Sequence, residues 1–526
     1  MDNPGLMRLL AVAILITLPW LNPFSPGPTA AVVPLLFAWC CAAGLLLLWA
    51  SGQPRQQRAD WVRAMAGAWL LAAGVSAVIG LLQYFGATGG LGVWVNHTEV
   101  GLAFGNLRQR NQFATLMNIG LVALLWWAGQ PLPAVHGRLM TRQPPQRAGQ
   151  ELAMLGLAMA LAMLLSAGNA ASSSRTGLLQ LLLVVALGLY WQRRMRQQDA
   201  SQPSGHALPK VLLAAVLTYA VATWALPWLA GLDPFNSGAW ARLRSGDAVC
   251  ASRLTLWRNV LFLIAQKPWL GWGWGELDYA HFITLYPGAR FCDILDNAHN
   301  LPLHLAVELG VPLALMVCGA ALWLAWRARP WHEQDATRRM AWGILAVILL
   351  HSLLEYPLWY GPFQMAAGLC VWLLLPKSTR AQGSLAPYLQ AGCAGALLTV
   401  CVLAGWQYHL ASQIYLDPGK RSPAYRVNTL EKTRHAFLFQ DQLRFAELTI
   451  TDLTPDNAAQ MNQLAKEMLH FSPEARVAVV VIDSARLLGR EAEARFYLAR
   501  LQAAFPQAYA DWRQEHDLPD PTPQGG

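Results

Sequence analysis

Charged residues are scarce in this sequence of 526 amino acids, where Asp, Glu, Lys and Arg together make up 13%. A typical soluble domain carries about 25% charged residues, so the composition excludes an ordinary soluble protein of this length. Hydrophobic residues make up 55% of the chain, and 24 residues are tryptophan. We therefore expect a membrane protein.

The common signatures of nucleotide and zinc chemistry are also missing. The sequence contains no G-x-x-x-x-G-K-[ST] loop, no G-x-G-x-x-G motif after a strand, and no H-E-x-x-H or C-x-x-C pattern. Nucleotide hydrolysis and zinc proteolysis therefore lose their usual sequence support. Neither a cofactor nor a resident metal is predicted.

The apolar residues gather in blocks of about 17 to 25, the length that crosses about 30 Å of hydrocarbon. About eleven such blocks predict an all-α polytopic membrane protein with about eleven transmembrane helices. The first block is short enough for a signal peptide, but it lacks a clearly basic start and a convincing cleavage site, so we expect a helix. The blocks are centred near residues 8–21, 30–50, 62–85, 112–128, 151–167, 176–191, 210–230, 302–327, 340–357, 361–375 and 388–409.

Lys and Arg occur in alternate connections between these blocks, as expected of short cytoplasmic loops. The alternation predicts a cytoplasmic amino terminus, and an odd number of crossings then places the residues after Leu410 outside. The formal net charge of +9 is thus mainly a topology signal, and no nucleic-acid partner is expected. The basic connections hold Arg55 and Arg58; Arg138, Arg142 and Arg147; Arg193, Arg194 and Arg196; Arg327, Arg329, Arg338 and Arg339; and Lys377 and Arg380.

The chain is predicted to have two domains, a membrane domain over residues 1–410 with a long external loop at 231–300, and an external helical tail over 411–526. In the tail, "SARLLGREAEARFYLARLQAAFP" has the pattern of a helix, a Gly turn and a second helix, like half of a tetratricopeptide unit. Two interpretations remain open for the tail: a cap on the membrane domain, or a surface that binds a peptide.

Two features stand out in the long external loop. Cys250 and Cys292 are the two of the eight cysteines that lie outside predicted helices, and they could close a disulfide in an oxidising compartment. The segment "SRLTLWRNVLFLIAQKPWLGWGWGE" is amphipathic and rich in tryptophan, which suits the membrane interface. We expect this segment to lie along the bilayer surface.

Charged and polar residues at membrane depth are costly, so each is a functional candidate. The predicted topology brings a set of them to the outer leaflet, which predicts a shared site. Its arginines have the forked donors that match phosphate oxygens. The set comprises Arg108, Arg110, Asn111, Arg175, Arg253, Arg258, His299, His304, Glu308, His351 and Glu355.

A histidine near a bound anion could act as a general base on an incoming hydroxyl. His299 is the preferred base, because Asn300 beside it could orient its ring. His304 and Glu308 are four residues apart and are expected to share a hydrogen bond at the start of a helix. A metal site built from these three side chains is disfavoured, since His299 and His304 do not share a helix face.

Each candidate also has a structural interpretation. Arg108 and Arg110 would contact lipid headgroups, and Arg175 would anchor a helix end at the interface. Arg253 and Arg258 would face water on an amphipathic helix. The pair His351 and Glu355 would supply a hydrogen bond between packed helices.

Several stretches, in the order found here, resemble the bacterial O-antigen ligase and polymerase superfamily, and in particular its branch of pilin-type protein O-oligosaccharyltransferases. The resemblance spans roughly residues 95–375, and the tail resembles the C-terminal domain of that branch. The stretches are "QRNQFATLM", "SSSRTGLLQ", "PWLGWGWGE", "AHNLPLHLAVELGVP" and "LHSLLEYPLWY".

The resemblance implies a glycosyltransferase of the bacterial inner membrane, with its active site and tail in the periplasm. It would transfer a preassembled oligosaccharide from undecaprenyl diphosphate to Ser or Thr of a protein such as pilin, with membrane lipids around it. His299 would be the catalytic base, and Arg175 and Arg253 would act on the diphosphate. Substrate-binding residues would be Arg110, Asn111, Arg258, Asn300, Glu355, Tyr356 and His351.

Four alternatives to this function remain open. Ligation to lipid A core and polymerisation of repeat units would use the same diphosphate chemistry on another acceptor, and the extended tail favours a protein acceptor. A transporter of lipid-linked glycan would need polar groups on both sides and often repeat symmetry, which we do not find. A membrane scaffold with a protein-binding tail is the remaining alternative.

Overall fold

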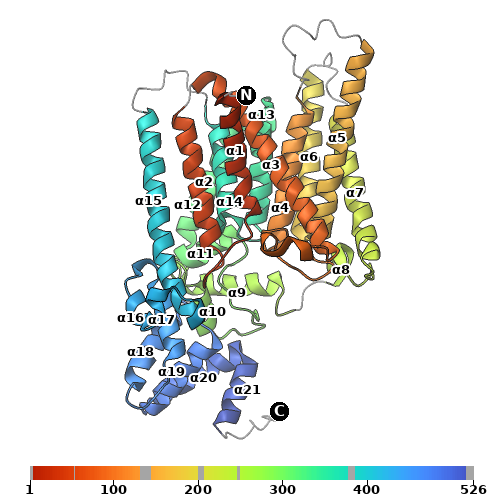
Figure 1. Ribbon diagram of the computed structural model, residues 1–526. Coiled ribbons are helices and arrows are strands. Elements are labelled where there is room, and N and C mark those ends of the chain that lie inside the picture. The colour runs from red at the N-terminus through yellow and green to blue at the C-terminus, as the bar shows by residue number, and fades with distance from the viewer. Residues whose placement is uncertain are drawn as a thin grey trace. The chain divides into compact units, whose positions relative to one another are not determined.

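Helices make up the whole regular structure of the protein in the computed structural model, which describes residues 4–51, 54–130, 144–198, 207–245, 249–376 and 386–516. Among these residues no strand occurs, as predicted for an all-α protein. The chain divides into two compact units (Figure 1). The first unit comprises Met1–Gly246 and Ala325–Leu403, and the second comprises Asp247–Leu324 and Ala404–Gly526.

The first unit is a bundle of long helices joined by short ones (Figure 1). Its helices lie along the apolar blocks, because a backbone surrounded by hydrocarbon must satisfy its hydrogen bonds internally. They are α1 (Pro4–Leu21), α2 (Val32–Ala50), α3 (Pro54–Tyr84), η1 (Gly89–Trp94), α4 (Arg110–Ala128), α5 (Pro144–Ala171), α6 (Arg175–Gln198), α7 (Ala207–Leu229), α8 (Gly238–Ser245), η3 (Pro330–His332), α13 (Ala336–Ser352), η4 (Pro357–Trp359) and α14 (Gly361–Leu374).

The protein has the helices of a multi-pass membrane protein. In the described part of the chain, seven helices are long and apolar enough to cross a membrane, and two shorter apolar ones are Gly5–Leu21 and Gly361–Leu374. The finer count of about eleven crossings stays a prediction. Of the basic residues used to predict orientation, Arg138, Arg142, Lys377 and Arg380 lie outside the described residues. The seven are Val32–Ala50, Arg58–Tyr84, Gly149–Ala171, Arg175–Gln197, Ala207–Leu229, Val311–His332 and Ala386–Tyr415.

Two predicted helices are shorter than their apolar blocks. The block at 302–327 is divided at Gly310, whose φ of 88° separates α11 (Leu301–Leu309) from α12 (Val311–Ala328). The block at 340–357 is helical only to Ser352, so Glu355 lies in the turn that follows α13 and not on the helix as expected. Apolar periodicity cannot report such breaks, because backbone conformation and not hydropathy causes them.

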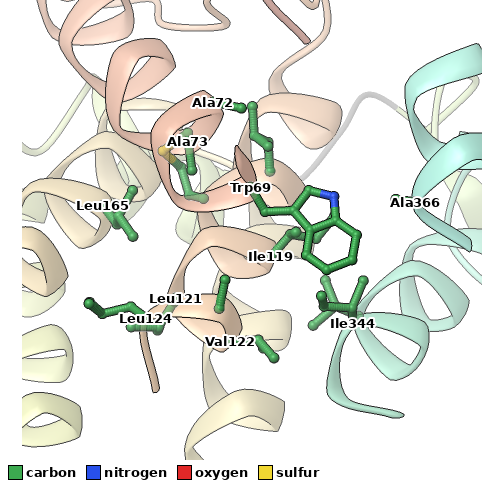
Figure 2. Close-up of a cluster of buried hydrophobic side chains, with 14 of the residues drawn as sticks. Trp69, Ala72, Ala73, Ile119, Leu121, Val122, Leu124, Leu165, Ile344 and Ala366 are labelled. Carbon is green, nitrogen blue, oxygen red and sulfur yellow. The ribbon is translucent and has the colours of Figure 1, made fainter. Parts of the chain in front are cut away.

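The core of the first unit depends on small residues that let helices approach closely. Figure 2 shows Trp69 and Ala73 of α3 near Ile119 of α4, with Ile344 of α13 beside them. A Cβ at Gly120 of α4 would lie 2.3 Å from the Ala73 Cβ, so only glycine fits there. Trp69 and Ile119 are completely buried, and this tight packing holds α4 firmly between its neighbours.

The second unit combines the long loop with the tail. The predicted helix, Gly turn and helix of the tail are present as α19 and α20, joined at Gly489 with a φ of 70°. The helices that lie in this unit are α9 (Arg253–Gln266), α10 (Leu277–Ile283), α11, η5 (Gln413–Tyr415), η6 (Pro418–Lys420), η7 (Pro423–Tyr425), α16 (Thr429–Thr433), η8 (Phe437–Phe439), α17 (Gln440–Ile450), α18 (Ala458–Met468), α19 (Ala475–Leu487), α20 (Glu491–Ala504) and α21 (Pro506–Glu515), while α12 and α15 (Ala386–Ser412) each extend across a boundary between the units.

Helix α10 of the loop is fastened to the tail. Phe282 is buried in the apolar core formed mainly by α17 to α21. The Arg500 Nε donates to the Ile283 carbonyl oxygen at 3.0 Å. The His470 Nδ1 lies 2.7 Å from the Glu276 Oε2, and the His470 ring stacks on Tyr279. The predicted boundary at residue 410 therefore separates segments that pack together, although the membrane and external assignment stays a prediction.

A carboxyl group in α10 makes the stability of this unit depend on pH. Burial raises the pKa of Asp278 from 3.8 to about 7, and the nearby Glu276 and Asp296 add to the effect, while the Tyr279 N–H opposes it. Between pH 4 and 7 the unfolded chain has lost this proton and the folded chain still holds it, so stability falls as pH rises through that window.

We expect Asp278→Asn to stabilise the second unit by about 2 kcal/mol at pH 8 and to have little effect near pH 4. Thermal unfolding followed from pH 4 to 8 measures this change, with Asp293→Asn on the exposed part of the loop as the control. An unchanged pH slope in the Asp278 variant would contradict the assignment.

Candidate active site

A buried polar network in the first unit joins residues that are far apart in sequence. Glu355 is 6% exposed, and its carboxylate accepts from Asn111 Nδ2 at 3.0 Å and from Gln109 Nε2 at 3.2 Å. The Asn111 Oδ1 in turn accepts from the Ser174 hydroxyl at 2.6 Å. A carboxylate this buried is expensive unless it is hydrogen-bonded, so these amides stabilise it while it orients them.

The network ends at the start of helix α6. The Ser174 hydroxyl that donates to Asn111 also accepts from the Gly177 N–H at 2.9 Å, which caps the helix. Arg175 is the first residue of α6 and therefore adds its guanidinium to the positive end of the helix dipole. A helix amino terminus that carries an arginine suits an anion such as phosphate.

Gly177 explains why α6 can begin so close to α4 and α5. A Cβ there would lie 2.3 Å from Asn169 Oδ1 and 2.6 Å from the Ala114 Cβ. The Gly177 carbonyl oxygen accepts from Asn169 Nδ2 at 3.1 Å and from Asn118 Nδ2 at 3.2 Å. The "SSSRTG" stretch thus places Arg175 by fixing the first turn of its helix.

Two further arginines, Arg110 and Arg242, lie in the same unit. Arg110 is the first residue of α4, next to Asn111, and lies within electrostatic range of Arg242 in α8. Two like charges at close range repel each other unless an anion lies between them. Arg242 was not among the predicted site residues, although the basic run "ARLRS" in an external loop was a signal for it. Arg108 instead donates to the Pro23 carbonyl oxygen at 2.6 Å.

His351 and Tyr356 lie close to Glu355 in the sequence but differ in their burial and contacts. His351 is completely buried, with its Nδ1 2.9 Å from the Thr115 hydroxyl oxygen and its ring edge-on to Phe363. This is the arrangement of a hydrogen bond between packed helices, and contact of His351 with substrate stays a prediction. Tyr356 is half-buried and stacks against Tyr360 in the turn that carries Glu355.

In the second unit, His299 has an unusual backbone. Its φ is 48°, in the left-handed region that residues other than glycine rarely adopt. The His299 N–H donates to Asn297 Oδ1 at 2.8 Å, which holds the turn. Such conformations concentrate at functional sites, because the surrounding structure must keep a costly backbone in place. The imidazole is half-buried at the start of α11.

Asn300 has a different local role from the one expected. It is the N-cap of α11, and its side-chain oxygen accepts from the Leu303 N–H at 3.1 Å. The structure thus uses this amide to begin the helix directly after His299. Contact of Asn300 with the His299 ring or with substrate stays a prediction.

Helix α9 brings Arg253 to the face that supports His299. Ser252 caps the helix by accepting from the Thr255 N–H, and Arg253 is its first residue. One turn later, Trp257 Nε1 donates to the Ala298 carbonyl oxygen at 3.1 Å, immediately before His299. Residues four apart share a helix face, so Arg253 lies on the side of α9 that holds the His299 turn. Arg258 is exposed, as its structural interpretation expected.

Two glycines allow the tryptophan-rich segment to cross the end of α11. A Cβ at Gly310 would lie 2.1 Å from the Trp269 carbonyl oxygen, and one at Gly271 would lie 2.3 Å from the Glu308 carbonyl oxygen. Backbone hydrogen bonds join the two segments there. The Trp272 N–H, for example, donates to the Val307 carbonyl oxygen at 2.8 Å. Trp269 is 75% exposed, and its place at the membrane interface stays a prediction.

Two further histidines of the second unit are structural. The His304 Nε2 lies 3.5 Å from the Glu308 Oε2 on α11, and both side chains are buried, so the predicted pair is in contact but does not form the expected hydrogen bond. Burial and then Arg290 lower the pKa of His281 to about 3. Its ring nitrogens lie 2.8 Å from the Tyr286 hydroxyl and 3.2 Å from the Phe291 carbonyl oxygen. Neither ring is placed to receive a substrate proton.

The predicted disulfide between Cys250 and Cys292 is present, with their Cα atoms 5.2 Å apart. It ties the start of α9 to the loop that leads into the His299 turn. The Asn259 side chain of α9 supports the same loop, since its Oδ1 accepts from the Phe291 N–H at 2.8 Å and its Nδ2 donates to the Ala289 carbonyl oxygen. The turn is therefore fastened to α9 at several points.

Three protein-family models match separate parts of the chain. Residues 159–318, which hold Arg175, Arg253 and His299, match the model described as "O-Antigen ligase". Residues 103–128, which hold Arg110 and Asn111, match "Protein glycosylation ligase". Residues 339–518 match "Virulence factor membrane-bound polymerase, C-terminal".

Each of these three models covers less than half of the chain.

Two curated proteins of Acinetobacter baylyi are similar to this chain. One is described as a general O-oligosaccharyltransferase, 25% identical over 266 residues, which cover 47% of this chain and 46% of the relative. The other is described as a ComP-specific O-oligosaccharyltransferase, 25% identical over 173 residues, which cover 31% of this chain and 30% of the relative. Each match thus spans less than half of the relative's length.

The structure groups the predicted site residues in two sets. The first unit joins Asn111 and Glu355 directly and connects them to Arg175 through Ser174. The second unit joins the helix of Arg253 to the His299 turn. That the two sets form one site stays a prediction. Sequence reasoning missed Gln109, Ser174 and Asn297, because isolated polar residues at helix ends and in loops carry no periodic signal. It missed Arg242 despite the basic run around it.

Proposed function

We propose that this protein is a protein O-oligosaccharyltransferase, which transfers a preassembled oligosaccharide from a polyprenyl diphosphate to a Ser or Thr hydroxyl of a periplasmic protein such as a pilin. The observation that carries the proposal is Arg175 at the capped amino terminus of α6, supported by Asn111 and Glu355. That arrangement suits a diphosphate. The two O-oligosaccharyltransferases among the relatives support a protein acceptor.

In the proposed mechanism, the acceptor hydroxyl oxygen attacks the anomeric carbon of the reducing-end sugar. The bond from that carbon to the diphosphate oxygen breaks, and inversion results from the direct displacement. His299 receives the hydroxyl proton, and Arg175 and Arg253 bind the diphosphate and stabilise the charge that develops on its leaving oxygen. Arg110, with Arg242 near it, provides further positive charge for the donor.

The topology proposed for this reaction places the amino terminus in the cytoplasm of a bacterium and about eleven crossings in the inner membrane. Arg175 and His299 would then act at the periplasmic side, where the lipid-linked glycan donor would bind. The second unit contains the residues predicted to be an external tail, and its Cys250–Cys292 disulfide supports an oxidising compartment.

A second candidate is polymerisation of glycan repeat units or their ligation to lipid A core. The match of residues 339–518 to a membrane-bound polymerase model favours it, since that region includes Glu355 and most of the tail. The three reactions share the diphosphate donor and differ in the acceptor hydroxyl. The proposal of a protein acceptor is therefore tested by supplying each acceptor in turn.

The test is to reconstitute the full chain with a lipid-linked oligosaccharide and a candidate pilin, and to measure the intact mass of the pilin. We expect an increase equal to one glycan. Parallel reactions contain lipid A core or a second lipid-linked glycan in place of pilin. Modification of lipid A core or elongation of the glycan, with unmodified pilin, would overturn the proposal in favour of the second candidate.

A further inference from the structure

A cavity of about 770 Å³ lies in the first unit, between α4, α6, α7 and α13. This volume is within the range of about 300–1,000 Å³ that is usual for small-ligand sites. The cavity includes Arg196 near the end of α6, whereas Arg175 begins the same helix. At 1.5 Å per residue, the 21 positions between them correspond to about 32 Å, which is close to the thickness of the hydrocarbon core. The Arg196 end of the cavity therefore lies about one membrane thickness from Arg175.

The walls of the cavity are largely apolar, with side chains such as Val122, Leu187, Trp191 and Met340. Glycines 129, 188 and 343 contribute no side chains, which leaves room between the helices. Apolar walls of this kind suit an acyl chain better than a water-soluble molecule.

The charged groups of the lining have one sign. Arg196 and Arg339 contribute to it from α6 and α13, and the described residues that line it include no Asp, Glu or Lys. Gln192 and Gln334 are its other polar side chains with amide donors. Two guanidinium groups and two amides at one level are donors that match a phosphate diester.

Two acids, Asp335 and Glu333, act on Arg339 electrostatically, and each also accepts hydrogen bonds from other groups. The Glu333 Oε2 accepts from Arg338 Nε at 2.7 Å. The Asp335 carboxylate caps α13 by accepting from the Thr337 N–H at 2.8 Å. Arg339 Nη1 instead lies 2.6 Å from the Met195 sulfur, inside the cavity wall.

We infer that this cavity binds an anionic phospholipid, with an acyl chain between the helices and the phosphate held by Arg196 and Arg339. Basic pockets between transmembrane helices at the cytoplasmic side are known to suit anionic headgroups, and the arginine-rich end of this bundle is the proposed cytoplasmic end. The lipid would join α6 to α13, the helix that precedes the Glu355 turn, at the end remote from the proposed glycan transfer.

The inference is tested with the full-length protein in phosphatidylcholine nanodiscs that contain a phosphatidylglycerol probe with a diazirine on its acyl chain. After photolysis, labelled peptides are mapped by mass spectrometry. We expect labelling of cavity residues of α6 and α13, such as Leu187 and Met340. Unlabelled phosphatidylglycerol should reduce this labelling at least fivefold. Added phosphatidylcholine and free glycerol phosphate should not reduce it.

Variants then test the role of the arginines. The double variant Arg196→Gln with Arg339→Gln should lose at least fivefold of the cavity labelling. Arg193→Gln, an exposed residue of α6 outside the lining, should stay within twofold of the parent. Ala336→Phe, which fills the cavity and keeps both charges, should also lower labelling and covers the case in which the double variant fails to fold.

Three results would overturn the inference. Full labelling in a folded double variant would remove the role of the arginines. Equal competition by phosphatidylcholine would mean a site without headgroup preference. Effective competition by glycerol phosphate would mean a site for a free phosphate ester. Glycan transfer by the protein is measured separately, so loss of lipid labelling and loss of the proposed activity are distinguishable.

Discussion

Replacement of His299 by Ala is expected to lower glycan transfer by about a hundredfold to ten-thousandfold, the range for loss of a general base. The imidazole would receive the acceptor proton during displacement, and neither of the two other histidines between residues 247 and 324 is placed to substitute. His281 has both ring nitrogens near hydrogen-bonding partners, and His304 is buried beside Glu308. Intact-mass analysis of the acceptor over time measures the rate.

The control for this prediction is His435→Ala, an exposed histidine in the tail. It should transfer glycan at the parental rate. The His299 variant should retain the Cys250–Cys292 disulfide and the parental unfolding temperature, since the backbone N–H of residue 299 makes the hydrogen bond to Asn297 that holds the turn. Transfer at a rate within about threefold of the parent would remove His299 from the role of base, because loss of a base costs far more.

Replacement of Arg175 by Lys is expected to lower transfer by about a hundredfold, similar to loss of one preorganised donor to a developing oxyanion. Lysine keeps the positive charge at the start of α6 but lacks the fork that binds two diphosphate oxygens at once. The Ser174 cap and the Asn111–Glu355 pair hold the helix start in either case, so the loss should appear in the rate and not in stability.

Arg193→Lys provides a matched control, because it makes the same change near the other end of α6. It should leave the rate unchanged. If Arg175→Lys also retains most of the parental rate, a positive charge at the helix start suffices, and the alternative of an interfacial anchor is favoured for Arg175.

Local patterns in the sequence predicted much of this protein correctly. Apolar blocks indicated the helices, and the restriction of non-helical cysteines to one loop indicated the pair Cys250 and Cys292. The spacing of His304 and Glu308 predicted their contact, because four residues make about one helical turn. These features depend on neighbours in the chain or on composition, which sequence reports directly.

Backbone geometry was harder to predict. The break at Gly310 and the end of α13 before Glu355 lie within apolar blocks that give no sign of them. The left-handed conformation of His299 and the N-cap role of Asn300 also require the backbone path. At Gly310 the backbone meets a distant segment, the Trp269 carbonyl oxygen, whereas Asn297 and Leu303 hold the His299 turn and the Asn300 cap by local hydrogen bonds.

The sequence by itself determined that this is an all-helical membrane protein. It also determined which charged residues are candidates for the functional site, because the cost of placing charge in hydrocarbon is a property of each residue. Only the tertiary structure decided how those residues are supported. It joined Asn111 to Glu355 across 244 positions, brought Arg242 near Arg110, and showed the cavity that includes Arg196 and Arg339. These relations depend on which helix faces pack together, and that choice is made by the summed contacts of many small side chains and not by any one motif.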